Sequence, residues 1–122
     1  MELRYSIQSS DLSSKDYDGI DFEGAKKLIL DVDWGSENQK ATDLEDAGED
    51  SCPYNIMFYN QNAYFQVMNL SGNYEVYCSI PKSGFLGKLL GVTTTKTLVD
   101  ISETKLFLYL DLFFQSKFDE IN

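Results

Sequence analysis

Three short aromatic segments between residues 54 and 80 constrain the fold of this chain more than any other feature. They read YNIMFYN, AYFQVMNL and NYEVYCSI, and β-branched and aromatic residues of this kind favour strands. The linkers, residues 60–62 and 71–73, are short and rich in Asn, Ser and Gly, which is typical of tight turns. We therefore expect three consecutive antiparallel strands. The buried face of the third strand is predicted to carry Tyr74, Val76, Cys78 and Ile80.

Two further segments resemble strands. Residues 2–8 alternate apolar and polar side chains, and residues 92–101 are rich in β-branched residues. Residues 9–20, rich in Ser and Asp, are predicted to form a loop. Residues 81–91 carry three glycines and a proline among apolar side chains, and we expect a hydrophobic loop there.

Two segments have an apolar stripe at helical spacing. Asp21 is a suitable N-cap for a helix that starts at Phe22, and we expect Trp34 and Gly35 to close it. Residues 103–121 have a broader apolar face, which indicates a helix packed deeply against a sheet. Asp100 or Ser102 is expected to begin it.

Residues 36–51 are nearly all polar, with a thin apolar edge at spacings of three. This pattern predicts a short helix, capped by Ser36 and ended at Gly48. The alternative is an acidic loop.

The order of these segments predicts a single α+β domain over residues 1–122. Its core is expected to be a mainly antiparallel sheet of four to five strands, with the helices packed on one face. The length of 122 residues suits one domain.

The negative charge is concentrated in the first part of the chain. Residues 1–50 contain 14 acidic and 5 basic residues, a net charge of −9, whereas residues 51–122 contain 6 and 5, a net charge of −1. Such a field repels phosphate backbones and anionic membranes, and it attracts a basic protein. We therefore expect a protein partner, and neither nucleic acid nor a membrane.

Eight acidic residues and a single base, Lys40, lie between residues 31 and 50. Dense like charge destabilises a folded state, so a docking surface for Lys or Arg competes with the simpler interpretation of a solvated helix face. Trp34 is either a packing residue or an interface anchor. The candidate partner-binding residues are Asp31, Asp33, Trp34, Glu37, Asp43, Glu45, Asp46, Glu49 and Asp50.

The residue types that usually carry chemistry are scarce. The chain has no His and no glycine-rich phosphate loop, which removes the commonest general base and metal ligand. Cys52 and Cys78 lie far apart in sequence, and the acidic stretches do not match a calcium loop. We expect no catalytic residue, cofactor or metal, although a small enzyme or ligand carrier is a further hypothesis. No membrane span or signal peptide is expected, and this predicts a cytoplasmic protein.

The layout resembles small immunity proteins of bacterial polymorphic-toxin and contact-dependent growth inhibition systems. The resemblance rests on a helix ending in DVDW, the acidic SENQKATDLEDAGEDS, the turn-linked strands AYFQVMNLSGNYEVYCSI and the strand–helix end TKTLVDISETKLFLYLDLFFQSKF. It covers most of the chain as architecture and charge. It implies a non-catalytic inhibitor that binds one toxin domain, often a basic nuclease. A monomer is expected.

A second hypothesis is a structural or regulatory module. It would assemble through the aromatic sheet or through residues 81–91.

Overall fold

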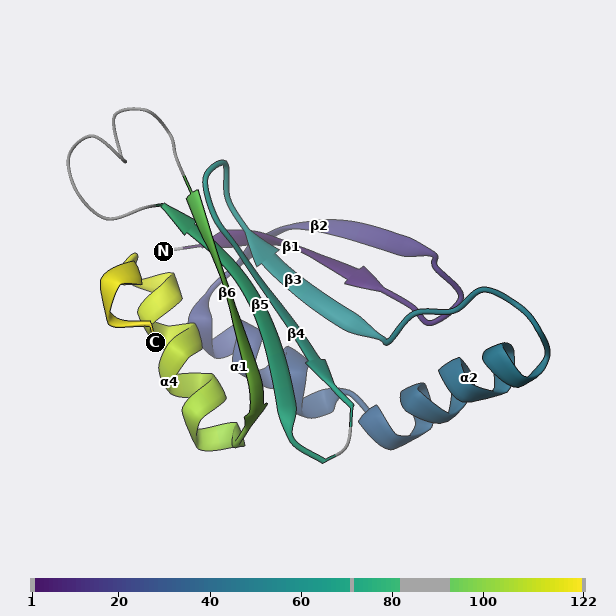
Figure 1. Cartoon of the computed structure of the whole chain (residues 1–122). Helices are drawn as coiled ribbons and strands as arrows, with labels where there is room; N and C mark the ends of the chain where they lie inside the picture. Colours follow the sequence, from purple (N-terminus) through teal and green to yellow (C-terminus); the bar gives the residue numbers. More distant parts are fainter. Residues whose placement is uncertain (1, 71, 82–92, 122) are drawn as a thin grey trace.

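The computed structural model describes residues 2–70, 72–81 and 93–121, which form one antiparallel sheet with three α-helices and a short 3-10 helix (Figure 1). The strand order in the sheet is β2-β1-β3-β4-β5-β6. The strands are β1 (Leu3–Gln8), β2 (Ser14–Ile20), β3 (Asn55–Tyr59), β4 (Tyr64–Asn69), β5 (Tyr74–Pro81) and β6 (Thr93–Ile101). The helices are α1 (Phe22–Asp31), α2 (Trp34–Asp46), α4 (Glu103–Phe114) and the 3-10 helix η1 (Phe118–Glu120).

The three aromatic segments form the predicted meander at the centre of the sheet. β3 pairs with β4 and β4 with β5, so that Phe58 lies opposite Phe65 and Phe65 opposite Cys78. The expected buried face of β5 is confirmed, since Tyr74, Val76, Cys78 and Ile80 are all buried. The α+β class, the single domain and the antiparallel sheet are therefore as predicted.

The prediction of a loop over residues 9–20 is wrong for its second half, and the sheet has six strands instead of four to five. Ser14–Ile20 forms β2, which pairs with β1 at the edge of the sheet. β2 consists mainly of polar residues, and most of it is exposed. It therefore lacks the alternation of apolar and polar residues that would predict a strand. Ile20 is the one residue of β2 that packs against the core, and Tyr17 stacks on Tyr5 with ring centroids 4.8 Å apart.

The first helix begins as predicted and ends earlier. The carboxylate of Asp21 accepts a hydrogen bond from the Gly24 amide at 2.8 Å, which is an N-cap. The backbone turns extended at Val32, and a second helix starts at Trp34. The expectation that Trp34 and Gly35 close the first helix is therefore wrong: Trp34 opens α2, and Asp33 caps α2 in place of Ser36.

The polar segment after residue 36 is helical, as preferred over a loop. α2 runs to Asp46, and Gly48 follows its end with a φ of +76°, the left-handed conformation expected after a helix.

The last helix begins at the expected Ser102 cap but does not run to residue 121. α4 ends at Phe114, Ser116 takes a φ of +58°, and the chain continues into η1. A hydrophobic loop was expected over residues 81–91. Pro81 is instead the last residue of β5, and residues 82–91 lie outside the described part of the chain.

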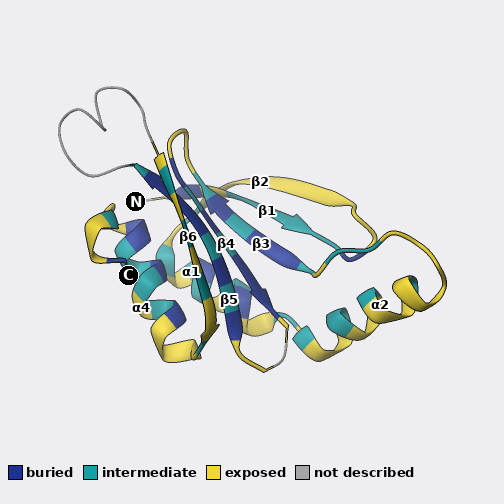
Figure 2. Cartoon of the chain, viewed as in Figure 1, coloured by how far each residue is buried: buried dark blue, intermediate teal, exposed yellow. Residues whose placement is uncertain are grey.

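The core lies between the sheet and helices α1 and α4, which cover the same face (Figure 1). Phe113 packs on Phe65 with ring centroids 5.4 Å apart, and Phe114 packs on Phe58 at 6.0 Å. Figure 2 shows the buried residues along the central strands and on the inner sides of these two helices. α2 is different, because none of its residues is buried; two of the three α-helices thus form the layer expected on one face.

Candidate functional site: the acidic surface around α2

Helix α2 lies beyond one end of the sheet and carries most of the predicted site (Figure 1). The carboxylate of Asp33 accepts a hydrogen bond from the Ser36 amide at 3.1 Å and so fixes its first turn. The residues of α2 that are partly buried recur every three or four positions and define one inner stripe. They are Trp34, Glu37, Asn38, Ala41 and Leu44.

Trp34 attaches the start of α2 to the domain. Its ring makes edge contacts with Tyr54 and Tyr74, with centroids 5.7 and 6.1 Å away, and its Nε1 donates to the carbonyl oxygen of Ile29 at 3.2 Å. One turn later, Nδ2 of Asn38 donates to the carbonyl oxygen of Asn69 at 2.7 Å. The indole is thus engaged in packing, which is the first of the two roles considered for it.

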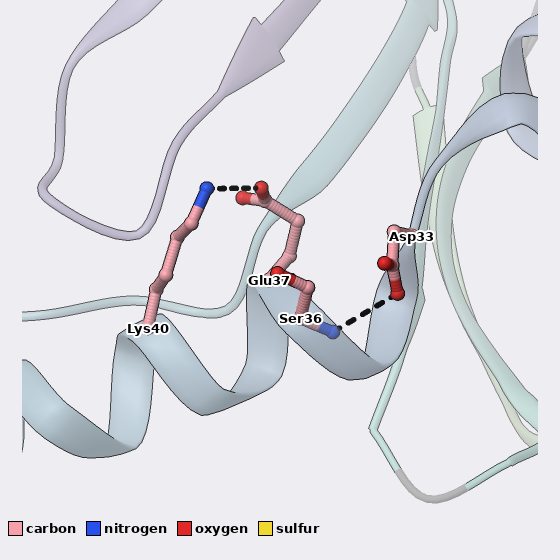
Figure 3. A network of polar contacts seen from close by, with 4 residues as sticks. All are labelled: Asp33, Ser36, Glu37 and Lys40. Carbon is pink, nitrogen blue, oxygen red and sulfur yellow. Dashed lines mark hydrogen bonds and ion pairs between the residues drawn. The ribbon is translucent and has the colours of Figure 1, made fainter.

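Glu37 and Lys40 form an ion pair on the side of α2 that faces the sheet (Figure 3). Nζ of Lys40 lies 3.0 Å from Oε1 of Glu37, and the Glu37 side chain is 19% exposed against 62% for Lys40. The hydrogen bond and charge of Glu37 raise the pKa of Lys40. The pKa of the nearby Tyr54 is also raised, first by burial and then by the charge of Glu37. The one base in this region is therefore already paired with its least exposed acid.

The other acids of α2 and its continuation lie in solvent. Asp43, Glu45 and Asp46 occupy the last turn, where no base is present. Carboxylates at this end oppose the helix dipole, whose negative end is the C-terminus. Glu49 and Asp50 follow in the exposed connection to β3. Among the described residues, no ion pair involves any of these five carboxylates. They form a surface of uncompensated negative charge.

The connection after α2 brings the β1–β2 turn to the same end of the molecule. The amide of Cys52 donates to the carbonyl oxygen of Ser10 at 3.1 Å, and its thiol donates to that of Ser9 at 3.2 Å. Asp11, exposed in this turn, accepts hydrogen bonds from the hydroxyl and then the amide of Ser13, and these bonds lower the pKa of its carboxyl group. The acidic surface therefore extends from α2 towards the hairpin.

A shallow depression of about 280 Å³ separates this hairpin from Tyr54. Its lining residues are Ile7, Ser9, Ser13, Ser14, Lys15, Tyr17 and Tyr54. Tyr54 thus lies between this depression on one side and Trp34 on the other.

The predicted residues are spread along α2 and the segments that flank it, with different roles. Seven carboxylates are exposed on α2 or beside it, whereas Glu37 and Trp34 are half-buried. Asp31 ends α1 and Asp33 caps α2, so these two mark the corner between the helices. Sequence reasoning missed Asp11 and Tyr54. The Ser-rich turn around Asp11 was visible in the sequence, but its contact with residue 52 was not.

The sheet face opposite α1 and α4 is a second candidate surface. Met57, Gln66, Tyr77 and Thr97 are successive cross-strand neighbours on this face, and three of them are half-buried with Thr97 exposed. Tyr59 and Tyr64 form the next such pair. No helix of the described residues covers this face (Figure 2).

Comparison with protein-family models, curated proteins and solved structures finds no match. Within residues 2–70, 72–81 and 93–121, no three His, Cys, Asp or Glu residues are placed to hold a metal ion. In the same residues, no helix has both the length and the apolar character needed to cross a bilayer.

Proposed function

We propose that this protein is a non-catalytic immunity protein that binds and neutralises a cognate toxin domain through the acidic surface around α2. The toxin domain would be basic, and a nuclease fits the resemblance described above. The observation that carries the proposal is the unpaired, exposed charge of Asp43, Glu45, Asp46, Glu49 and Asp50. This charge lies at the unfavourable end of a helix that buries none of its residues.

The placement of these charges favours a binding surface over a helix that is acidic only because it is exposed to solvent. An exposed helix gains stability from acids in its first turn and bases in its last, and α2 has acids in its last turn with no compensating base. A basic partner would remove this repulsion on binding. Long-range attraction would speed association, and packing contacts would set the dissociation rate.

The contacts of Trp34 give it a positioning role in this proposal. It holds α2 against Tyr54 and Tyr74, and so presents the carboxylates in a fixed arrangement. Pre-organisation of this kind lowers the entropy lost when a partner binds.

The first test is rescue of growth. The protein is co-expressed with a candidate toxin domain encoded beside its gene, and cells that express this toxin domain are expected to survive only when the protein is present. A toxin that still kills cells containing the folded protein would refute the proposal.

The second test locates the interface with two variants of equal charge change. Glu45→Gln, Asp46→Asn, Glu49→Gln and Asp50→Asn together should slow association with that toxin domain about tenfold or more at low salt. The control neutralises four exposed acids elsewhere, Glu2, Glu23, Asp119 and Glu120. Equal association rates for the two variants would move the interface away from α2.

The uncovered tyrosine-rich face supports a second candidate function, a module that assembles with other proteins through its sheet. Tyrosine with Ser, Thr and Asn is a composition found at recognition surfaces. Tyr77→Glu would then abolish assembly with those proteins, measured by light scattering, whereas neutralisation of the α2 acids would leave assembly intact.

A further inference from the structure

The end of β6 carries a bulge at the edge of the sheet. β5 and β6 change register between Tyr74 and Val76, so that Glu75 lies opposite two residues of β6, Val99 and Asp100. Asp100 has a φ of +56°, a left-handed conformation that residues other than glycine rarely adopt. Bulges of this kind redirect side chains and are common beside functional sites. The bulge therefore gives this end of β6 a surface that a regular strand edge would not have.

A hollow of about 240 Å³ lies beside this bulge. Its lining residues come from the β4–β5 turn, the start of β5 and the end of β6, and they are Leu70, Asn73, Tyr74, Glu75, Val99 and Asp100. Tyr74 also contacts the ring of Trp34, with centroids 6.1 Å apart, so the hollow lies at the end of the sheet where α2 begins (Figure 1). It thus adjoins the first turn of α2, away from the acidic last turn of that helix.

Two apolar side chains of the hollow are exposed to solvent. Leu70 follows β4 and is 47% exposed, and Val99 of β6 is 59% exposed. These residues are distant in sequence, and the fold brings both to the same hollow. An apolar side chain that a ligand covers contributes to binding in proportion to the area removed from water. The walls of the hollow are therefore suited to the aliphatic part of a ligand.

The charges of the hollow are all negative. Glu75 and Asp100 provide two carboxylates, and its described lining residues include no lysine or arginine. Neither carboxylate forms an ion pair with another residue in the described part of the chain. Oδ1 of Asp100 accepts a hydrogen bond from Nδ2 of Asn73 at 2.7 Å, which orients the carboxylate. The hollow therefore combines apolar walls with uncompensated negative charge.

We propose that this hollow binds an arginine side chain of the basic partner, with the aliphatic stem against Leu70 and Val99 and the guanidinium beside Glu75 and Asp100. Only the identity of the partner rests on the proposed function. Long basic side chains cover apolar surface with their stems while the charged group stays at a polar site. A guanidinium has five N–H donors in one plane and can bridge two carboxylates, whereas an ammonium group is a compact point charge. Arginine is also enriched among the residues that dominate interface affinity.

The test is an NMR titration of the isotope-labelled full chain with n-butylguanidinium, which reproduces the stem and the charge of arginine. At constant ionic strength, the amide resonances of residues 73–75 and 99–100 should shift and saturate at millimolar concentration. Guanidinium alone should bind there about tenfold more weakly, because the contact of the stem is lost. The last turn of α2, whose carboxylates are exposed, is the internal comparison and should respond equally to the two cations.

Two variants separate the charge of the hollow from its apolar walls. Glu75→Gln with Asp100→Asn retains the shape and should weaken binding of n-butylguanidinium about tenfold; asparagine tolerates the positive φ at residue 100. Leu70→Ser should reduce the preference for n-butylguanidinium over guanidinium. Asp119→Asn with Glu120→Gln makes the same change in net charge elsewhere and should leave binding unchanged. Thermal unfolding establishes that each variant is folded.

The proposal would be overturned by the absence of a saturable shift at residues 73–75 and 99–100, by equal binding of the two cations there, or by unchanged binding in the variant that neutralises Glu75 and Asp100. This titration needs no toxin domain, so its failure is distinguishable from a failure of growth rescue. With a toxin domain that the protein neutralises, the same variant should raise the dissociation rate about tenfold. An unchanged dissociation rate would also contradict the proposal.

Discussion

Nε1 of Trp34 donates a hydrogen bond to the carbonyl oxygen of Ile29 over 3.2 Å, and this contact closes the corner between α1 and α2. Ile29 is fully buried, whereas Trp34 is half-buried, so the bond joins the core to the acidic helix. The first prediction follows from this bond.

Trp34→Phe should lower the free energy of unfolding by about 1 kcal/mol, because a ring remains but the hydrogen bond is lost. Trp34→Ala should lower it by about 2–3 kcal/mol, since the contacts with Tyr54 and Tyr74 are lost as well. Urea unfolding measures both, and hydrogen exchange of the α2 amides should accelerate in the alanine variant. The control is Leu108→Ala, at an apolar residue that is 56% exposed. Equal losses for Trp34→Ala and Leu108→Ala would contradict the packing role.

The cap of α2 gives a second prediction. Asp33→Ala should destabilise the protein by about 1 kcal/mol, because the Ser36 amide loses its acceptor, whereas Asp33→Ser should retain most of the stability. Asp31→Ala is the matched control, two residues away. Its carboxylate ends α1, where it opposes the helix dipole, so its removal should be neutral or slightly stabilising. Chemical denaturation compares the three variants, and equal effects of Asp33→Ala and Asp31→Ala would argue against the cap.

The acidic last turn of α2 gives a third prediction. Neutralising its acids should stabilise the protein, although it should slow association with the proposed toxin domain. Glu45→Gln with Asp46→Asn should stabilise the protein by about 0.5 kcal/mol at low salt, because two charges at the negative end of the helix are removed. The gain should disappear in high salt, where the charges are screened. Asp119→Asn with Glu120→Gln controls for net charge. A loss of stability in the α2 variant would mean that these acids have structural partners.

The two thiols should react very differently, which is the fourth prediction. Burial raises the pKa of Cys78 to about 12 from an ordinary value of 9.0, so almost no thiolate forms at pH 8 in the folded protein. Cys52 is half-buried. A thiol reagent should therefore modify Cys52 while the protein is folded and Cys78 only after unfolding. Mass spectrometry of the labelled peptides distinguishes the two, and equal labelling would contradict the burial of Cys78.

The same pKa shift has a consequence for stability at high pH. The folded state holds the Cys78 proton more tightly than the unfolded state does, so its contribution to stability is complete below about pH 9 and is lost as the pH rises towards about 12. Cys78→Val should have a smaller decline over this range.

The sequence predicts the centre of this fold well because its signals are local. Aromatic strands with short linkers define β3, β4 and β5, and side-chain caps at Asp21 and Ser102 define two helix starts. Each of these features depends on residues within a few positions of one another. Such signals do not require knowledge of the tertiary structure.

The errors arise where a distant contact decides the structure. β2 is a strand because it pairs with β1, although its own residues are polar and exposed. The corner at Val32 ends the first helix earlier than expected and moves the start of the second to Trp34, and the bond between Trp34 and Ile29 that holds this corner is not apparent from composition. The acids of the candidate site were apparent from the sequence, whereas the contact of Cys52 with the β1–β2 turn joins segments that are far apart along the chain.

Helix α2 contributes no buried residue to the domain, and this has an evolutionary consequence. Its outward positions can change without loss of the core, which is formed by α1, α4 and the sheet. Under the proposed function, a lineage could therefore alter the charges on this helix as its toxin changes, while it retains the same core. Variation among relatives should then be greatest on α2 and least along β3, β4 and β5.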